Sequence, residues 1–453
     1  MTECNEQALL FSSLGCRNFV ADFAGGDLTS DGGLPLLREV DRRMGMIAAL
    51  DAAICDPRFQ PLVTHDQRTI LAQRIYALAA GYEDLNDHHA LRNDTLLQAM
   101  TDRRLKCHQE DGDPLSSPPT LCRLENRITR GDLARMSKAL VEIFIASHTT
   151  PPEELVLDFD ATDDAVHGNQ EGRFFHGYYD HYCFLPLYVT CDHQLLVAYL
   201  RPANIDGAKH SRAILKLLVD RFRQAWPNVR IIFRADSGFC RWRMMRWCDR
   251  HGVGYILGLA KNEVLKRLSR RSMVQARWEY RRTKFKQRLF EEFQYAASTW
   301  DHKRRVIAKA EHSDQGENPR FVVTTMAEDA QELYDKLYCQ RGDAENRIKE
   351  QQLGLFADRT SCHAFVANQF RVLLSAAAYV LMETMRRVGL AGTELASAQV
   401  TTIRLKLLKI GGRIIRSVRR LVVHLASGYP LQQAFRTILR NIQQWRCVPA
   451  PST

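Results

Sequence analysis

The chain is poor in the features that mark secreted, zinc-binding and membrane-spanning proteins. Its 12 cysteines are scattered over 453 residues without a C-x-x-C pair, so neither a structural zinc site of the usual spacing nor a disulfide scaffold is expected. The N-terminus lacks the basic stretch and apolar core of a signal peptide. The most apolar helix candidate, residues 365–385, is interrupted by Arg371 and Glu383 and is predicted to be a buried core helix. We therefore expect a cytoplasmic protein with reduced thiols and no membrane partner.

Acidic residues are scarce relative to basic ones. The formal net charge is +11, and the isoelectric point is near 9.1. A polyanion, most simply a nucleic acid, is the partner that such a chain attracts, although many soluble proteins are basic without one. Residues 261–311 hold fifteen Lys or Arg against six Asp or Glu, and residues 401–440 hold nine Lys or Arg and no acid. Each stretch can follow a phosphate backbone or form a solvated basic face.

The pattern of apolar residues and turn formers divides the chain into three regions. Residues 1–150 are predicted to be mainly helical and end at Pro151-Pro152, because two prolines exclude a continuous helix. Residues 151–388 are predicted to form strands and helices with a β-rich insertion at about 262–325, and residues 389–453 a basic helical region. Three strands, a helix and then alternating strands and helices describe an α/β fold, a mixed sheet flanked by helices in the RNase H-like order.

Two aspartates end apolar runs that are predicted to be strands. Asp160 closes the run that begins at Leu155, and Asp236 closes the run that begins at Ile231. Ligands of open α/β sheets gather beyond the carboxyl ends of strands, where both aspartates are expected. Carboxylates suit Mg²⁺, and two such ions can activate the attacking oxygen and stabilise the leaving one at a phosphodiester. A solvated acidic turn is the alternative, and Asp158, on the same side of its strand as Asp160, is also available as a ligand.

A later helical pattern supplies a third carboxylate. At 100° per residue, one face carries five side chains, Tyr338, Arg341, Glu345, Lys349 and Gln352. Glu345 can contribute to a metal site while Arg341 and Lys349 hold phosphates, and Arg is suited to bidentate phosphate contacts. The alternative is an exposed helix face that is held together by ion pairs.

Three segments together resemble the DDE transposases of bacterial insertion sequences, in particular the group called transposase DDE domain group 1. They are Leu157-Asp158-Phe159-Asp160-Ala161-Thr162 with the following Gly172–Tyr179, Arg234-Ala235-Asp236-Ser237-Gly238-Phe239, and Tyr338-x-x-Arg341-x-x-x-Glu345. The resemblance extends from about residue 20 to about residue 430. Its motifs are specific in combination and weak one at a time.

The resemblance implies an enzyme that binds the terminal inverted repeats of an insertion sequence, cleaves the DNA ends and joins them to target DNA. It implies a metal-binding triad of Asp160, Asp236 and Glu345, with Mg²⁺ or Mn²⁺ as two ions, and a homodimer on double-stranded DNA. Ala161-Thr162 after Asp160 favours Asp160 over Asp158 as the first ligand, and the choice stays open. Related chains often carry a lysine seven residues after the glutamate, where this chain has Gln352, so Lys349 is the candidate for that role.

Basic and aromatic side chains outside the triad are candidates for contacts with DNA. We expect Arg123 and Arg127 in the N-terminal region to help read the terminal repeats, and four residues of the basic tail to lie on DNA, namely Arg404, Lys406, Lys409 and Arg413. Trp278 and Trp300 either stack on an unpaired base or pack in the core. The competing functions are a catalytically inactive DNA-binding regulator of transposition and an RNase H-fold nuclease without strand transfer.

Overall fold

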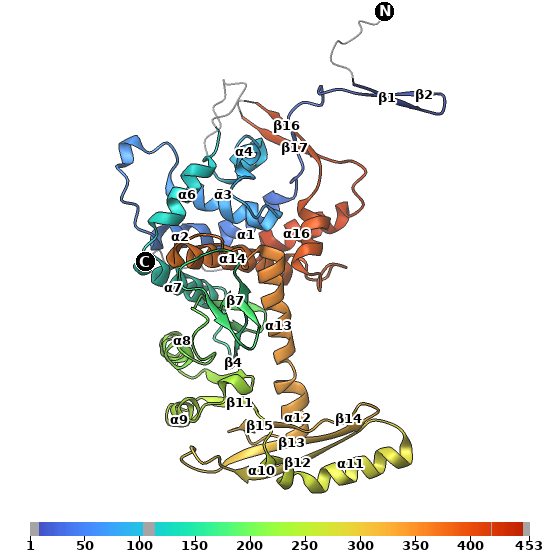
Figure 1. The fold of residues 1–453 in the computed structure, drawn as a ribbon. Coiled ribbons are helices and arrows are strands. Elements are labelled where there is room, and N and C mark those ends of the chain that lie inside the picture. The colour runs from blue at the N-terminus through green and yellow to red at the C-terminus, as the bar shows by residue number, and fades with distance from the viewer. Residues whose placement is uncertain (1–8, 103–113, 418, 447–453) are drawn as a thin grey trace, which may run out of the picture. The chain divides into compact units, whose positions relative to one another are not determined.

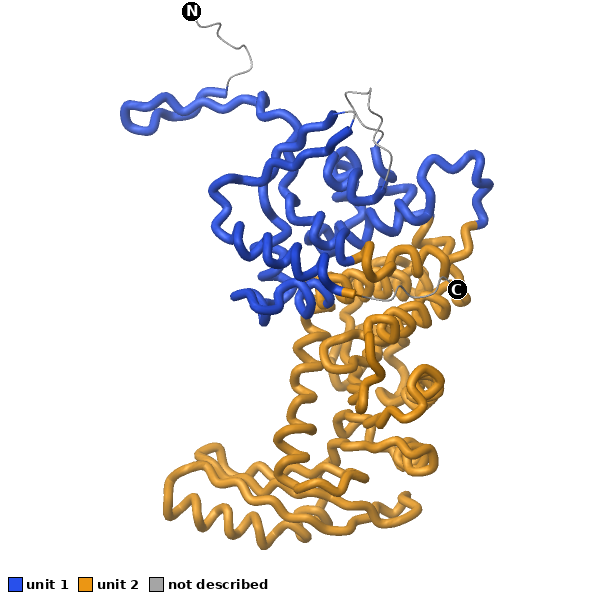
Figure 2. Tube along the Cα trace, turned by 180° about the vertical axis from the view of Figure 1, so that it is seen from behind, with its two compact units in different colours: residues 1–40, 57–123, 384–445 blue, residues 41–56, 124–383, 446–453 orange. Residues whose placement is uncertain are grey.

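The computed structural model describes residues 9–102, 114–417 and 419–446, so the first residues, which bear on the signal-peptide prediction, lie outside the described part. The chain forms two compact units, each built from discontinuous segments (Figure 2). Unit 1 comprises residues 1–40, 57–123 and 384–445, and unit 2 comprises residues 41–56, 124–383 and 446–453. The sequence-based division into 1–150, 151–388 and 389–453 follows the chain, whereas the units follow the contacts that distant segments make.

Unit 1 combines helices from both ends of the chain. Its helices are α1 Leu34–Met44 and α6 Pro118–Arg127, which both run on into unit 2, and η1 Gln60–Leu62, α3 Gln67–Ala80, α4 His88–Leu91, α5 Thr95–Met100, η5 Met385–Gly389, α15 Val400–Ile403, η6 Arg404–Leu408 and α16 Gln432–Gln444. Almost every residue of α3 is buried, so this helix is the centre of the unit. The strands β1 Leu9–Leu14 and β2 Arg17–Ala21 pair as an exposed hairpin.

The prediction of a helical C-terminal region is wrong in its middle part. The strands β16 Gly412–Arg416 and β17 Leu421–Leu425 pair with each other, and β16 also pairs with β3 Leu28–Thr29. Gly411-Gly412 stops the preceding helix, and the β-branched residues that follow favour a pleated, half-buried strand. Burial alternates along β16, as expected for a strand with one covered face.

Unit 2 is built on a mixed sheet in the order β12-β13-β15-β11-β10-β4-β8-β9. Its strands are β4 Glu154–Ala161, β8 Leu187–Cys191, β9 Gln194–Tyr199, β10 Arg230–Ala235, β11 Gly254–Leu259, β12 Gln287–Tyr295, β13 Arg304–Ser313, with which β14 Gly316–Glu317 also pairs, and β15 Arg320–Thr324. The central strands β4, β10 and β11 are parallel, and the outer pairs are antiparallel. A second small sheet has the order β5-β7-β6, from Asp164–Ala165, His181–Phe184 and Phe174–His176. This arrangement agrees with the predicted mixed sheet flanked by helices.

The insertion differs from the prediction in two respects. Its strands β12, β13 and β15 lie within the predicted insertion at about 262–325, but they extend the main sheet beyond β11 and do not form a separate insertion. Two helices precede them, α10 Glu263–Leu268 and α11 Arg270–Thr283, so the insertion is mixed rather than β-rich.

Helices cover both faces of the main sheet, as Figure 1 shows for α8 and α9 on one side and α13 on the other. One face packs against α7 Arg130–Ala146, α8 Ser211–Ala225 and α9 Trp242–Arg250 through the larger core, in which Phe159 and Phe233 are fully buried. The other face packs against the helix that begins at Ala330, through a smaller cluster that includes Ile232 and Ile256. Because side chains alternate along a strand, even-numbered residues of β4 and β10 face this second helix.

The helix on the second face is not a regular α-helix. It begins as α12 Ala330–Glu332, passes through the π-helical turn η3 Leu333–Tyr338, continues as α13 Arg341–Lys349 and ends in the π-helical turn η4 Glu350–Gly354. A π-turn accommodates an extra residue and therefore shifts the side chains that follow around the helix axis. The helix face predicted from the sequence assumed 100° per residue from Tyr338 to Gln352. Because both of these residues lie in π-helical turns, their side chains are rotated away from the predicted positions relative to Arg341 and Glu345.

The apolar helix α14 Phe365–Thr384 is long enough and apolar enough to cross a membrane, when extended to Gly389, by length and composition alone. Of its most apolar window, 78% is buried inside the protein, as expected for a core helix. In unit 2, Gln369 of α14 accepts a hydrogen bond from the Leu200 amide and donates one to the Ala198 carbonyl, which satisfies part of the free edge of β9.

Candidate active site

Four charged side chains lie on the same face of two neighbouring parallel strands. In the register of β4 and β10, Asp158 is opposite Arg234, and Phe159 is opposite Ala235. One step further, Asp160, the last residue but one of β4, lies close enough to Asp236, which directly follows β10, for their charges to interact. The parallel register therefore brings the two predicted aspartates together at the carboxyl ends of their strands.

The buried pair of Asp158 and Arg234 fixes this part of the sheet. The Arg234 guanidinium donates two hydrogen bonds to the Asp158 carboxylate, at 2.5 and 2.6 Å, and a third to the carbonyl of Leu337 in η3. Both partners are almost inaccessible to solvent. Arg234 thus joins β4, β10 and the helix that carries Tyr338, Arg341 and Glu345. Because Asp158 is occupied in this way, the structure favours Asp160 as the aspartate that is free to bind a ligand.

Arg341 connects the strand ends to the third carboxylate. Its guanidinium lies 2.5 Å from Glu345 Oε1 and 3.6 Å from Asp160 Oδ2. Burial lowers the pKa of Arg341, but the charges of Glu345, Asp160 and Asp236, together with Tyr338, raise it overall. All three predicted carboxylates therefore act on one guanidinium.

The negative charges of Asp160, Asp236 and Glu345 repel one another. Burial raises the pKa of Asp160 to about 7, the nearby Arg341 opposes this shift, and the charges of Asp236 and Glu345 add to it. A carboxyl group in such surroundings gains from additional positive charge. Within residues 9–102, 114–417 and 419–446, no three His, Cys, Asp or Glu side chains are already drawn together as a metal-ligand cluster. The chemistry of the donor set nevertheless fits a divalent cation, since it offers only hard oxygen ligands.

Gly258 of β11 was missed by the sequence analysis. A Cβ at this position would lie 2.6 Å from the Tyr338 hydroxyl and 2.9 Å from the Ser237 amide nitrogen. Only glycine therefore lets the segment after Asp236 and the Tyr338 ring approach the sheet at this point. Asp236 Oδ1 accepts a hydrogen bond of 2.8 Å from the Gly238 amide, which orients the carboxylate in the turn η2 Ser237–Phe239. A glycine inside an otherwise apolar strand was the available signal.

The other residues predicted from the helix face have different positions. Lys349 is exposed to solvent. Gln352, where related chains carry a lysine, donates a hydrogen bond of 2.9 Å to the Asp163 carbonyl and so connects the end of this helix to the loop after Asp160. The structure thus leaves Lys349 without a defined place near the carboxylates.

The predicted DNA contact of Arg404 is corrected by the structure. Its side chain is buried in unit 1 and donates hydrogen bonds to the carbonyls of Ala79 and Leu78 at the end of α3. Burial lowers the pKa of Arg404 to about 10. The guanidinium adds hydrogen bonds to carbonyls of the last turn of α3, and it is not presented to a phosphate.

The remaining basic candidates fall into two groups. Lys409 lies 2.7 Å from Asp31 Oδ1 and 3.9 Å from the centre of the Tyr82 ring, and Arg127 lies 3.3 Å from Asp56 Oδ1. Both side chains are therefore engaged within their own unit. The other candidates are exposed, namely Arg123, Lys406 and Arg413.

The two tryptophans of the insertion differ as well. Trp300 packs against Tyr295 and Arg304 beside the larger core, as the packing alternative predicted. Trp278 on α11 is exposed, and Arg282 lies over its ring.

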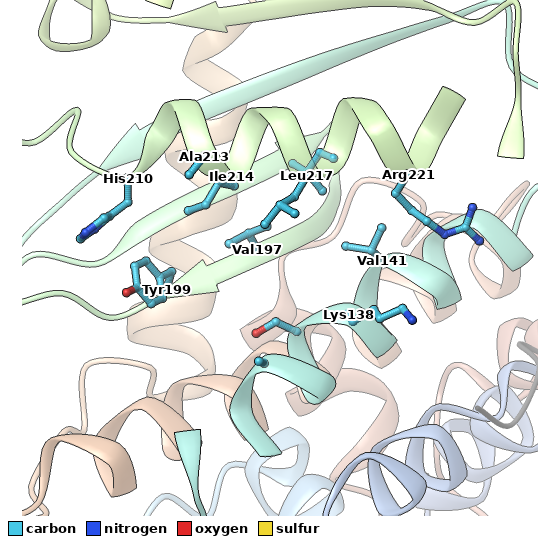
Figure 3. A pocket seen from close by; sticks show the side chains of 12 residues that line it. Lys138, Val141, Val197, Tyr199, His210, Ala213, Ile214, Leu217 and Arg221 are labelled. Atoms are coloured by element: carbon cyan, nitrogen blue, oxygen red, sulfur yellow. The ribbon is translucent and has the colours of Figure 1, made fainter. Parts of the chain in front are cut away.

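A cavity of about 530 Å³ lies on the other face of the sheet, away from the acids. Figure 3 shows Val141 of α7, Val197 of β9, and Ile214 and Leu217 of α8 lining it. Its walls are mainly apolar, and none of the predicted site residues lines it.

Comparisons with known proteins place the chain in a family. It matches the sequence profile described as Transposase DDE domain group 1 over residues 11–447. None of the curated proteins compared with the chain matches it. Among solved structures, it is similar to a piggyBac transposase in a synaptic complex with hairpin DNA, determined by cryo-EM, at 10% identity and a TM-score of 0.42, over 91% of this chain and 85% of that chain. Because the profile spans nearly its whole length, the chain belongs to the transposase DDE domain group 1 family.

Proposed function

We propose that this protein binds the terminal inverted repeats of an insertion sequence, cleaves the DNA ends and joins them to target DNA by metal-dependent phosphoryl transfer. The observation that carries the proposal is that Asp160 and Glu345 both lie within ion-pair distance of Arg341, with Asp236 near enough for its charge to act on Arg341 and Asp160. The family supports the class of reaction at the level of a transposase.

The sheet supports an RNase H-like assignment for the core. Its inner five strands have the order β9-β8-β4-β10-β11, with β4, β10 and β11 parallel and β8 and β9 antiparallel to their neighbours. Along the chain, these strands and the helices between them follow the element order that the sequence pattern suggested for an RNase H-like fold. In this order β4, which carries Asp160, adjoins β10, which Asp236 directly follows, and Glu345 comes from a helix.

We propose Asp160, Asp236 and Glu345 as the ligands of Mg²⁺ or Mn²⁺, as two ions. When bound, such ions supply activation of the attacking oxygen and stabilisation of the leaving oxygen at a phosphodiester. The chain's own residues orient the groups: Arg234 fixes the strands and the helix, the Gly238 amide orients Asp236, and Arg341 offers a cation to a phosphate. Tyr338 lies close enough to Arg341 for each side chain to shift the pKa of the other.

The partners follow from the same reaction and from the charge of +11. We propose that the exposed residues Arg123, Lys406 and Arg413 contact double-stranded DNA, both terminal repeats and target. Because two ends must be cut and joined together, we propose a homodimer on DNA. Its place of action is then the cytoplasm of a bacterial cell, with no membrane partner.

Incubation of the purified chain with DNA that carries the ends flanking its own coding sequence tests the proposal. With Mg²⁺ or Mn²⁺ we expect nicking at the ends and joining to a second DNA molecule. Asp160→Asn, Asp236→Asn and Glu345→Gln should each abolish both steps and leave end binding nearly unchanged. Glu332→Gln is the matched control, since Glu332 is exposed on the same helix and pairs only locally with Lys336.

The alternatives give different results in the same assay. Binding without nicking, unaltered by Asp236→Asn, would indicate a regulator. Nicking without joining would indicate a nuclease. Full activity of Glu345→Gln would remove Glu345 from the triad.

A further inference from the structure

The hairpin formed by β6 and β7 exposes aromatic rings close to the acids. We call residues 173–184 the aromatic hairpin. Its rings Phe175, Tyr178 and Tyr182 are 53%, 85% and 49% exposed, respectively. Single exposed apolar residues are ordinary on a protein surface, whereas several rings on one short hairpin indicate a surface that binds something.

The rings of the aromatic hairpin pack edge to face with their neighbours. Phe175 and Tyr182 are opposite each other across the strands, with centres 5.7 Å apart and planes at 75°. Tyr178 stands at 87° to Tyr179 with centres 5.0 Å apart. Edge-to-face packing of this kind holds a ring without covering both of its faces. The Arg173 guanidinium lies 4.7 Å from the centre of the Tyr182 ring, which adds a positive charge to the same surface.

The opposite side of the aromatic hairpin is attached to the candidate active site. His181 Nε2 lies 2.9 Å from Asp163 Oδ2, and Asp163 follows Asp160 by three residues. The Asp163 carbonyl accepts the hydrogen bond of Gln352, beyond the helix that carries Glu345. The Thr360 hydroxyl donates a hydrogen bond of 2.9 Å to the buried Asp164 of β5, which pairs with β7. The position of the rings is therefore fixed relative to the acids by contacts within unit 2.

We propose that the aromatic hairpin is a stacking platform for an unpaired nucleobase of the DNA whose phosphate lies at the acids. This inference rests on the proposed function. Aromatic rings bind bases of any sequence, because every base has a π-face, and a neighbouring arginine strengthens the interaction. A nucleobase fits the surface better than a protein partner does, since the rings adjoin the site that would hold a phosphodiester and belong to a strongly basic chain.

A binding assay that does not depend on cleavage tests this proposal. The full-length chain with Glu345→Gln is titrated against a short duplex with a single-stranded overhang and against the same duplex with blunt ends, and the affinity ratio is measured by fluorescence anisotropy. We expect the overhang to be preferred. Tyr178→Leu and Tyr182→Leu should each reduce the preference by roughly tenfold, because they keep an apolar side chain but lose the ring. Tyr178→Phe should retain it.

Two further variants control the interpretation. Phe285→Leu removes an exposed ring elsewhere in unit 2 and should leave the ratio unchanged. Trp278→Leu tests the other exposed ring of the insertion. Loss of the overhang preference in Trp278→Leu, with no loss in Tyr178→Leu, would overturn the assignment. The assignment would also be overturned if the chain with an unaltered aromatic hairpin bound both duplexes equally well.

Failure of this inference can be told apart from failure of the proposed function. Normal cleavage and joining by a Tyr178→Leu chain with an unchanged overhang preference would overturn the inference alone. If the unaltered protein never cleaves DNA, but Tyr178→Leu loses the overhang preference, only the proposed function is overturned. If Tyr178→Leu instead converts a dimer to a monomer in sedimentation while the preference persists, the aromatic hairpin is a protein interface and the inference is wrong.

Discussion

Two aspartates only two residues apart have opposite surroundings. Asp158 is neutralised by two hydrogen bonds from Arg234. Asp160, at the end of the same strand, faces two other carboxylates and has a pKa raised to about 7 by burial and by their charges. The first arrangement stabilises the native state, and the second leaves a carboxyl group available for chemistry.

This contrast predicts different consequences for the two asparagine variants. Asp158→Asn leaves the buried Arg234 charge without its partner and should lower the free energy of unfolding by about 3–5 kcal/mol. Asp160→Asn removes a disfavoured charge and should not destabilise the protein at neutral pH, while cleavage is lost. Urea unfolding of both variants, together with the cleavage assay, checks this expectation. Equal destabilisation of the two variants would contradict it.

Gly258 predicts a steric effect on activity. Gly258→Ala places a Cβ 2.6 Å from the Tyr338 hydroxyl, so Tyr338 or the turn after Asp236 must move. We expect strand cleavage to fall by roughly 100-fold, as for a displacement of about 1 Å in an active site. Gly254→Ala on the same strand is the matched control, because its Cβ would meet no atom closer than 3.5 Å. Similar rates for the two variants would show that Gly258 is not required for the site.

At the scale of single elements, burial separates arginines that look alike in the sequence. Arg404→Ala should lower the free energy of unfolding by about 1.5–3 kcal/mol, since hydrogen bonds of a charged donor to the end of α3 are lost. Lys406→Ala, two residues later and exposed, should leave stability unchanged and reduce the slope of log affinity against log salt by about one. Chemical unfolding and DNA titrations at several salt concentrations measure both effects. A weaker salt dependence in Arg404→Ala at full stability would argue against the structural role.

The central elements could be predicted from the sequence because their pattern is strong. Buried parallel strands are continuous apolar runs, so β4 and β10 were found, and the acids at their ends followed. The strands β16 and β17 were missed because basic residues interleaved with Ile, Leu and Val fit a helix and a strand almost equally well. The burial of Arg404 could not be foreseen, since its partner carbonyl at Ala79 lies 325 residues earlier. The π-helical turns before and after α13 leave no recognisable sequence signal, so the prediction of the helix face assumed the same rotation per residue throughout.

At the scale of the whole molecule, the division into units depends on contacts that no local pattern reveals. Unit 1 draws on residues from both ends of the chain. Gly33, for example, approaches the backbone of Leu407 so closely that a Cβ would lie 1.7 Å from its carbonyl oxygen. The sequence pattern indicates a boundary at Pro151-Pro152, but it does not reveal that residues 384–445 pack with the N-terminal segments in unit 1.

Global stability should depend on pH through His88. Its ring nitrogens lie 2.9 Å from Gln73 Nε2 and 3.2 Å from Arg74 Nη1, and burial, together with the Arg74 charge, lowers the pKa of His88 from 6.5 to about 3. Between pH 6.5 and 3 the unfolded chain binds the proton and the folded one does not, so stability falls as the pH falls through this window.

The expected size of this effect is at most about 1.4 kcal/mol per pH unit. Unfolding free energies measured from pH 7.5 downwards should decrease less steeply for His88→Gln, which cannot take up the proton. Parallel profiles of the two proteins would contradict this assignment. The comparison of slopes remains informative even if the variant is less stable at every pH.

Arg234 has a mechanical consequence. Its guanidinium holds the carbonyl of Leu337 against two strands at once, so the helix cannot slide along the sheet at that level. Leu337 acts as a pivot, and Glu345 lies about two helical turns beyond it. Any adjustment that draws Glu345 towards the aspartates is then a swing about this fixed point, and a small change of angle at the pivot is amplified at the carboxylate.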